Sequence, residues 1–238
     1  MRRINSMAAI IVLLVGLASI PAMVNAQEVS LGADVVSSYV WRGLDCGDGM
    51  AIQPYVELGA GGLALGAWGS YAVGSDGAPE ADLYAGYSFD FGLSIGVTDY
   101  FFPGEDEVPL EGVPEHAPPG TPTTEMVHRD YFDYDNHTLE ANLGYEVGAF
   151  SLSANRYFDD NSNDDMYFEV SYDFGLVSLF VGAGDESYTT DGDLAICNFG
   201  ISAEKEIEIT DKYSLPLFGS VVFNPDSEGM YIVLGMSF

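Results

Sequence analysis

The chain has 238 residues, of which 47% are hydrophobic and 18% are charged, and acidic residues outnumber basic residues by 37 to 7. This composition excludes a collagen-like, a disulfide-framework and a disordered protein, and a net charge of −30 excludes nucleic-acid binding, which needs a cationic face. The many glycines and tyrosines, 28 and 15 of them, indicate an all-β protein with short turns.

Residues 1–26 have the pattern of a cleaved signal peptide. Two arginines precede an apolar run over residues 7–20, which is too short to cross a bilayer, and a proline then ends the run. Small residues at the end of the segment predict cleavage after Ala26, and no cysteine follows closely enough for a lipoprotein signal. The alternative is a retained N-terminal membrane anchor. We expect a mature chain of residues 27–238.

Beyond the signal peptide, apolar side chains recur at every second position in about twelve segments, which predicts β-strands. These segments are residues 29–42, 52–60, 63–73, 83–89, 93–102, 139–147, 150–155, 166–174, 177–183, 197–204, 213–221 and 230–238. No later stretch has the roughly 18 consecutive apolar residues of a membrane-spanning helix. If the chain inserts into a membrane, its strands must therefore close into a barrel, because lipid cannot satisfy an open sheet edge.

The connections between the predicted strands alternate in length. Tight turns are expected at residues 61–62, 90–92, 148–149 and 175, with a slightly longer one at 206–211. The connections between these turns are longer and acidic, and the longest covers residues 103–136 with several prolines. Short turns at one rim and long loops at the other are typical of outer-membrane β-barrels.

Aromatic residues fall at the ends of the predicted strands, as expected of two interfacial belts. Those on the long-loop side are Tyr39, Trp41, Tyr71, Tyr100, Phe102 and Phe158, and those on the short-turn side are Tyr87, Phe89, Tyr172, Phe174 and Phe238. A soluble β-sandwich is the alternative, since its strands also alternate. A sandwich would not require even strand lengths, aromatic residues at both strand ends or a final apolar strand.

Three stretches resemble the TorF-like porin family, whose members are outer-membrane proteins of mostly unassigned function. They are residues 38–43 (SYVWRG), 65–70 (LGAWGS) and 82–87 (DLYAGY), and residues 96–103 continue the likeness. The resemblance covers about residues 28–104. It implies an outer-membrane barrel, suggests a pore and supplies no catalytic residues. The strand that ends at Phe238 also looks like the C-terminal signal read by the barrel-insertion machinery.

The alternation assigns a set of acidic side chains to the inner face of the barrel, where they would attract cations and repel anions. The set consists of Asp34, Glu57, Asp82, Glu140, Glu146, Glu169, Asp173 and Glu204. The functional interpretation is a small, cation-preferring pore. The alternative is a plugged barrel whose acidic residues pair with other inward side chains.

Arg42 is the base expected among these inward acids. It should pair with at least one of them, and Glu57 on the neighbouring strand is the candidate. Such a pair could form a constriction in the pore, or it could be a structural salt bridge that fixes strand register. Cys46 and Cys197 lie on strands that are not sequence neighbours, and a bridge between them stays open.

Other motifs predict neither a metal site nor an enzyme. The acidic run at residues 159–165 is rich in oxygen ligands, but it lacks the glycine and glutamate of a calcium-binding loop and is interpreted as a solvated loop. His137 has the outward parity of a lipid-facing catalytic histidine, yet no serine is placed with it, and hydrolase or metalloprotease motifs are missing. We expect no cofactor and no catalysis.

The sequence thus predicts an all-β, antiparallel transmembrane barrel in the outer membrane of a diderm bacterium. Its expected function is passive diffusion of small hydrophilic solutes, with a preference for cations. The expected partners are outer-membrane lipid, these solutes and the barrel-insertion machinery. The alternative function is a non-conducting structural or adhesive barrel that binds a surface partner through its acidic loops, residues 103–136 above all.

Overall fold

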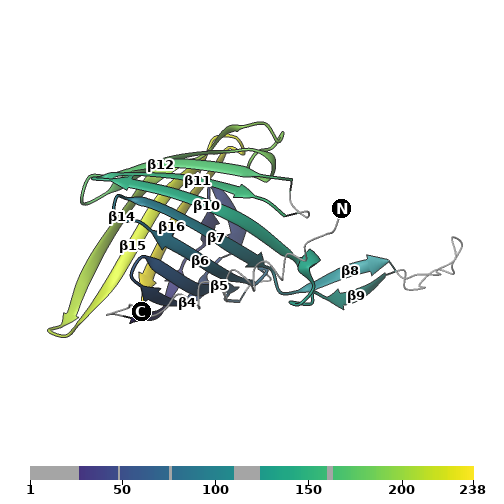
Figure 1. Ribbon diagram of the computed structural model, residues 1–238, viewed down its shortest axis with the longest axis horizontal. Coiled ribbons are helices and arrows are strands. Elements are labelled where there is room, and N and C mark those ends of the chain that lie inside the picture. Colours follow the sequence, from purple (N-terminus) through teal and green to yellow (C-terminus); the bar gives the residue numbers. More distant parts are fainter. Residues whose placement is uncertain (1–26, 48, 75–76, 110–123, 160–162) are drawn as a thin grey trace, which may run out of the picture.

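The computed structural model describes residues 27–47, 49–74, 77–109, 124–159 and 163–238. The predicted signal peptide and the centre of the long loop therefore lie outside the described residues. Twelve antiparallel strands form a closed barrel (Figure 1). The barrel strands are β1 (Gln27–Val36), β4 (Ala51–Ala60), β5 (Leu63–Ala72), β6 (Glu80–Ser88), β7 (Leu93–Phe101), β10 (His137–Val147), β11 (Phe150–Tyr157), β12 (Met166–Asp173), β13 (Ser178–Gly184), β14 (Ala195–Thr210), β15 (Tyr213–Asn224) and β16 (Gly229–Ser237).

The barrel is an up-and-down meander in which each barrel strand pairs with the next one along the chain, and β16 pairs with β1 to close it. Positive backbone φ angles of 61° and 62° at Gly61 and Gly148 let the chain reverse within two residues at the tight turns. The seam between β1 and β16 is completed by reciprocal backbone hydrogen bonds between Ala33 and Phe238. The predicted antiparallel barrel of about twelve strands is confirmed.

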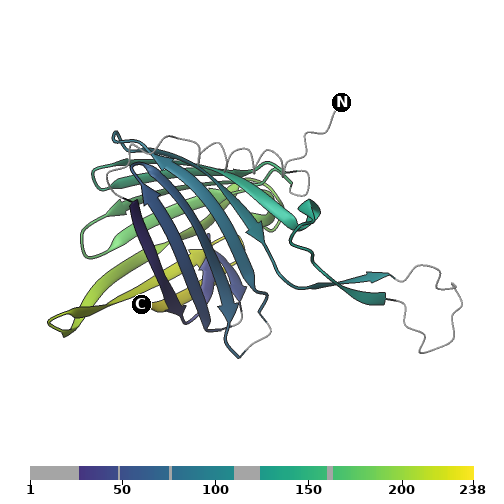
Figure 2. The ribbon, with the colours of Figure 1, turned by 60° about the horizontal axis from the view of Figure 1, so that its bottom comes forward.

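The first predicted segment, residues 29–42, was wrong as a single strand. The strand β1 ends at Val36, and β2 (Tyr39–Trp41) pairs with β3 (Leu44–Gly47) in a separate hairpin. Figures 1 and 2 show this purple hairpin inside the barrel. The alternation of apolar residues stays in phase across the bend after β1, so periodicity could not reveal it.

A second departure concerns the hairpin of β14 and β15, which extends beyond the short-turn rim of the barrel (Figure 1). The sequence predicted a turn over 206–211, but β14 continues to Thr210 and the reversal is made within two residues. A further hairpin, β8 (Glu105–Pro109) with β9 (Thr124–His128), projects from the long-loop rim (Figure 2). It belongs to the connection predicted over 103–136.

The outer face of the barrel is apolar and exposed, while polar side chains are buried inside it. Outward Leu31 and Leu234 are 76% and 64% exposed. The buried polar side chains of the barrel strands include Gln53, Ser70, Glu80, Asp82, Glu140, Asn198 and Asn224. A soluble sandwich would instead bury its apolar faces against each other, so this distribution excludes the sandwich alternative.

The predicted aromatic belts hold on one rim and fail in part on the other. On the short-turn side, Phe89, Phe174 and Phe238 are exposed on the outer face. On the long-loop side, Tyr39 and Trp41 lie on the internal hairpin, and Tyr100 donates a hydrogen bond inside the lumen. Among the described residues, no helix has the length and apolar character to cross a membrane.

Candidate functional site

The β2–β3 hairpin is rooted on the inner wall of the barrel. Val36 and Ala51, which flank the hairpin, are paired with each other and pack with Val233 of β16 in a small buried apolar cluster. Tyr39 and Val40 of the hairpin pack against this cluster. The base of the hairpin is therefore fixed to β1, β4 and β16.

The tip of the hairpin is a two-residue turn made by Arg42 and Gly43. Their φ angles of 51° and 83° are both positive, as a type I′ turn requires. The Gly43 carbonyl accepts a hydrogen bond of 3.2 Å from the Asn224 side chain of β15. A Cβ atom at Gly43 would collide with the backbone carbonyl of Cys197 in β14. The tip therefore touches the barrel wall so closely that only glycine fits.

Arg42 crosses the lumen to Glu140 of β10, which lies five strands from β1 around the twelve-strand barrel. Its Nη1 and Nη2 atoms donate to the two Glu140 carboxylate oxygens at 2.5 and 2.9 Å. Tyr100 and Asn142 also donate to Glu140, at 3.0 and 2.7 Å. The side chains of Arg42 and Glu140 are only 12% and 1% exposed, so the ion pair is shielded from water and fully hydrogen-bonded at its carboxylate.

Three aromatic rings surround the Arg42 guanidinium. Its Cζ atom lies 4.3, 4.7 and 5.7 Å from the ring centres of Trp41, Tyr167 and Tyr188, distances at which a ring face attracts a cation. Tyr188, in the short helix η2 (Glu186–Tyr188), also accepts a hydrogen bond of 2.6 Å from Nη1. Burial by itself would lower the Arg42 pKa, but the hydrogen bond to Glu140 and the neighbouring groups raise it above its ordinary value. The guanidinium therefore stays charged.

The other side of the hairpin contacts a pair of buried acids. The Tyr39 ring lies 5.5 Å from the Trp68 ring of β5. Burial, followed by the neighbouring Glu80 carboxylate, raises the pKa of Tyr39 above its ordinary value. Asp82 lies beside Glu80 on β6, and its buried Oδ1 atom has no hydrogen-bond partner among the described residues. This side of the hairpin is held by the Tyr39–Trp68 ring contact and by the contact of Tyr39 with Glu80.

The predicted lumen acids divide into two groups along the barrel. Asp82 and Glu140 are buried around the hairpin, whereas Glu146, Asp173 and Glu204 are exposed near the short-turn rim. The members of intermediate exposure are Asp34, Glu57 and Glu169. The strand registers put all of them on the inner face, where Glu57 accepts a hydrogen bond from Tyr84 and Glu169 accepts hydrogen bonds from Tyr167 and Asn198. One half of the lumen is packed, and the other is an accessible acidic vestibule.

The predicted pairing of Arg42 with Glu57 was wrong. It assumed that Arg42 continues the first strand and reaches its neighbour, but the hairpin carries Arg42 away from β4 and across the lumen to Glu140. The sequence assigned Arg42 and Glu140 to the lumen independently of each other. The contact between these two residues could not be inferred from the adjacency of strands.

Several residues of the site escaped the sequence-based prediction. Tyr188 lies in a loop, where no periodicity marks it. Cys197 had outward parity, but a β-bulge opposite Gly182 and Ala183 turns it inward, where it is fully buried beside Tyr167. Both cysteines are free thiols. Glu206 and Glu208 continue the inward row of Glu204 because β14 is longer than predicted.

His137 lies on the outer face at the start of β10, as its parity predicted. Its Nδ1 atom is 2.8 Å from an Asp99 carboxylate oxygen, and its Nε2 atom is 2.6 Å from the Tyr131 carbonyl oxygen. Both ring nitrogens therefore face acceptors, so neither is free to take a proton from a nucleophile. The arrangement fits a bridge between β7, β10 and the adjoining loop.

The acidic run at 159–165 is described only in part, since 160–162 lie outside the described residues. Asp159 accepts a hydrogen bond from the Leu139 backbone, and Asp165 accepts hydrogen bonds from Ser187. Asp164 forms an exposed ion pair with Arg156. Within the described ranges, no group of three or more histidine, cysteine or acidic side chains is placed to hold a metal ion.

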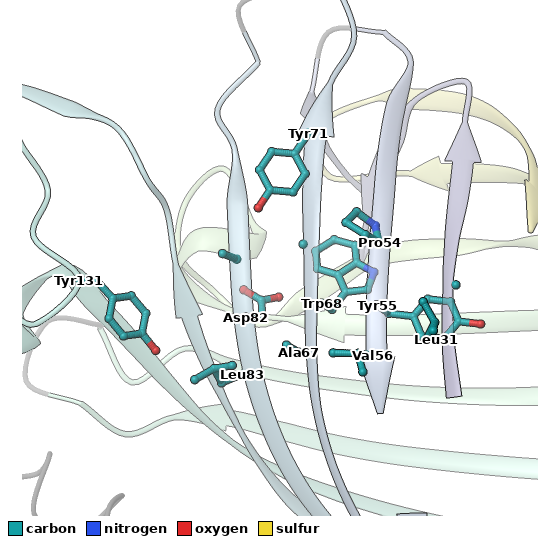
Figure 3. A pocket seen from close by; sticks show the side chains of 13 residues that line it. Leu31, Pro54, Tyr55, Val56, Ala67, Trp68, Tyr71, Asp82, Leu83 and Tyr131 are labelled. Carbon is teal, nitrogen blue, oxygen red and sulfur yellow. The ribbon is translucent and has the colours of Figure 1, made fainter. Parts of the chain in front are cut away.

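A groove of about 380 Å³ runs over the outer face of β1, β4, β5 and β6 (Figure 3). Its lining is mainly apolar and includes Leu31, Val56, Ala67 and Leu83, with Tyr131 reaching in from the long-loop side. Such a surface suits an acyl chain better than a polar solute. Its lining also includes Trp68 and Asp82, which belong to the hairpin's surroundings in the lumen.

Comparisons with known proteins identify a family and distantly similar solved structures. Residues 22–208 match the family model described as "Bacterial protein of unknown function (Gcw_chp)". The chain is also similar to outer membrane phospholipase A from Escherichia coli, with 11% identity and a TM-score of 0.38 over 92% of this chain and 91% of that one. A likeness this distant supports no functional inference. No curated protein matches the chain.

Proposed function

The chain belongs to the Gcw_chp family of bacterial proteins of unknown function, and we propose that it is an outer-membrane barrel that passes small hydrophilic solutes. Cations pass in preference to anions, and the β2–β3 hairpin closes the lumen at the long-loop end. The sequence likeness to the TorF-like porin family agrees with this function, and that finer assignment is part of the proposal.

The membrane location is supported by the inverted distribution of side chains. The exposed leucines of the outer wall would bury their surface in lipid. The strands pair in a closed ring, so the barrel has no open sheet edge whose backbone groups lipid would leave without hydrogen bonds. The apolar groove belongs to this lipid-facing wall. By the usual orientation of outer-membrane barrels, the tight turns face the periplasm and the long loops face outward. A signal peptide over residues 1–26 provides the export that this location needs.

Cation preference is supported by the accessible acids of the vestibule. Glu146, Asp173 and Glu204 are exposed within the short-turn half, and Glu206 and Glu208 extend the row beyond the rim. A low-dielectric wall that carries one sign of charge concentrates the opposite ion in the space it surrounds. Small cations would therefore collect on the periplasmic side of the hairpin.

The observation that carries the proposal is the Arg42–Glu140 bridge across the lumen. An internal hairpin that is attached to the wall at its base, and whose tip is held by the non-covalent contacts of Arg42 and Gly43, can move without unfolding the barrel. The same observation favours a second function, a permanently plugged structural or surface-binding barrel, because the bridge and its surroundings are so deeply buried.

Single-channel recording in a planar bilayer separates the two functions. The mature chain, residues 27–238, is compared with the Arg42→Ala variant under a salt gradient. Gated diffusion predicts discrete conductance steps with a cation-selective reversal potential, and longer openings in the variant. The matched control is Arg156→Ala, which removes an exposed bridge whose arginine side chain is 59% exposed. A folded, heat-modifiable barrel that stays silent in every variant would establish the plugged alternative.

We also propose that the protein is not an enzyme. The proposal rests on His137, because hydrogen-bond acceptors face both of its ring nitrogens. Phospholipid hydrolysis by the refolded chain that is lost on His137→Ala would contradict it.

A further inference from the structure

We propose that the barrel wall around Glu140 is a receptor for a guanidinium group, and that Arg42 occupies this receptor in the closed state. A solute that carries a guanidinium group would compete with Arg42 for the same seat. Only the identification of this ligand as a transported solute rests on the proposed function. The receptor itself is argued from the contacts of the described residues.

The receptor is built mainly by the barrel, and the hairpin that fills it adds the Trp41 ring, 4.3 Å from the Arg42 guanidinium carbon. Glu140 lies on β10, and the groups that orient its carboxylate, Tyr100 on β7 and Asn142 on β10, are also wall residues. The rings of Tyr167 and Tyr188 come from β12 and from η2. Tyr167 is fixed in turn because its hydroxyl donates to Glu169 and accepts from Asn198. Glu140 and Tyr167 are therefore positioned by wall contacts that do not involve Arg42.

The geometry selects a planar, forked cation. Two different nitrogen atoms of Arg42 donate to the two oxygens of one carboxylate, at 2.5 and 2.9 Å. A guanidinium makes this pair of bonds with a rigid fork, whereas an ammonium is a point charge that reaches the same oxygens one at a time. The Tyr167 and Tyr188 ring centres lie 4.7 and 5.7 Å from the guanidinium carbon, so the cation is also held by ring faces.

Arg42 is held in its seat under conditions that allow exchange. Its backbone φ of 51° lies in the left-handed region, which is unfavourable for a residue with a Cβ atom. Release of Arg42 would relieve this strain. The hairpin presents Arg42 in a fixed position, which gives it a high effective concentration at Glu140, so a free guanidinium should bind best when Arg42 is absent. The acidic vestibule would raise the local concentration of such a cation.

The test is chemical rescue of the Arg42→Ala variant. This variant removes the guanidinium group but leaves the residues that bind it, Glu140, Tyr167 and Tyr188, unchanged. Methylguanidinium is titrated into the folded variant in detergent, and its binding is measured by calorimetry and by the melting temperature of the barrel. Methylammonium is the control for charge without the fork, and methylurea is the control for shape without charge. We expect saturable binding of methylguanidinium, at least about tenfold tighter than that of methylammonium, because only the fork pairs with both oxygens.

Two further variants make the result specific to this seat. The Arg42→Ala/Glu140→Gln double variant should lose the binding of methylguanidinium, and the wild type should bind it at least about tenfold more weakly than Arg42→Ala because Arg42 competes. Equal responses to methylguanidinium and methylammonium, or equal binding by the single and double variants, would overturn the proposal.

The proposal stays testable if Arg42→Ala does not fold by itself. Its refolding yield with and without methylguanidinium then becomes the readout, and an unchanged yield would count against the receptor. Binding in detergent needs no conduction, so the two proposals can fail separately. If the barrel does not conduct but binds methylguanidinium, the porin proposal fails and the receptor proposal stands. If the barrel conducts but the Arg42→Ala variant does not bind methylguanidinium, only the receptor proposal fails.

Discussion

At the scale of single residues, the Arg42–Glu140 pair has the greatest energetic weight of the contacts described. Two charges shielded from water are costly to separate, because the partner that remains is buried without compensation. Glu140 is 1% exposed and would keep only its contacts to neutral donors if Arg42 were removed. The contribution of the pair is therefore measured best by changing both partners.

We expect Arg42→Ala to lower the free energy of unfolding by about 3–5 kcal/mol, the usual cost of leaving one buried charge unpaired. Arg42→Ala/Glu140→Gln should be less destabilised than Arg42→Ala alone, because the double variant has no orphaned carboxylate. Urea unfolding of the refolded barrels measures both values. The exposed Arg156→Ala change should cost no more than about 1 kcal/mol. Equal destabilisation by Arg42→Ala and Arg156→Ala would contradict the buried bridge.

Residue-level prediction from the sequence rested on inward parity, which carries no information about contacts. Strand alternation assigned Glu140 and Arg42 to the lumen, since a period of two needs no tertiary information. It could not pair them, because their contact spans 98 residues and depends on a hairpin that leaves the wall. Cys197 was misplaced because one extra residue in a bulge reverses the parity of a strand.

At the scale of elements, the sequence predicted the barrel strands well because each tight turn and each alternating run is a local signal. The β2–β3 hairpin was missed for an equally local reason. Its turn uses Arg42 and Gly43, whereas asparagine or aspartate before glycine is the usual signal for this turn. We therefore expect the stability of the barrel wall and the closure of the lumen to depend on different elements, which a deletion can separate.

Deleting Tyr39–Gly47 should open the lumen and leave the wall intact. Val36 and Ala51 are already paired across the ladder, so the remaining residues can join β1 to β4 by a short loop. We expect a heat-modifiable barrel whose single-channel conductance is several-fold higher than that of the wild type. Deleting part of the projecting β8–β9 hairpin serves as the control and should leave the conductance unchanged. An unchanged conductance after the first deletion would mean that the hairpin does not close the lumen.

At the scale of the whole molecule, charge and hydrophobicity are arranged inside out relative to a soluble protein. The apolar side chains cover the outer wall, and the acids that dominate the net charge of −30 include a row inside the lumen. Composition alone predicted the strong acidity but not its division into a packed half and an accessible half. That division depends on where the hairpin lies.

We expect the cation selectivity to come from the accessible half. Replacing Glu146 and Glu204 by glutamine and Asp173 by asparagine should reduce the reversal potential under a salt gradient. The wild-type preference should also weaken as salt rises, since charges are screened within about 10 Å at 0.1 M and about 3 Å at 1 M. Glu105→Gln on the projecting hairpin is the control for a charge change outside the lumen. If neither the three substitutions nor higher salt changed the reversal potential, the selectivity would have to come from another part of the protein.

The tip of the internal hairpin also dictates an order of events during biogenesis. Gly43 is seated against Asn224, 181 residues later in the chain, and its neighbour Arg42 is seated against Glu140. Neither seat exists until β10, β14 and β15 have been assembled, and contacts between such distant residues form late because the intervening chain must first be ordered. We therefore expect the nascent barrel to pass through an unsealed stage, with sealing as a maturation step that follows the completion of the wall.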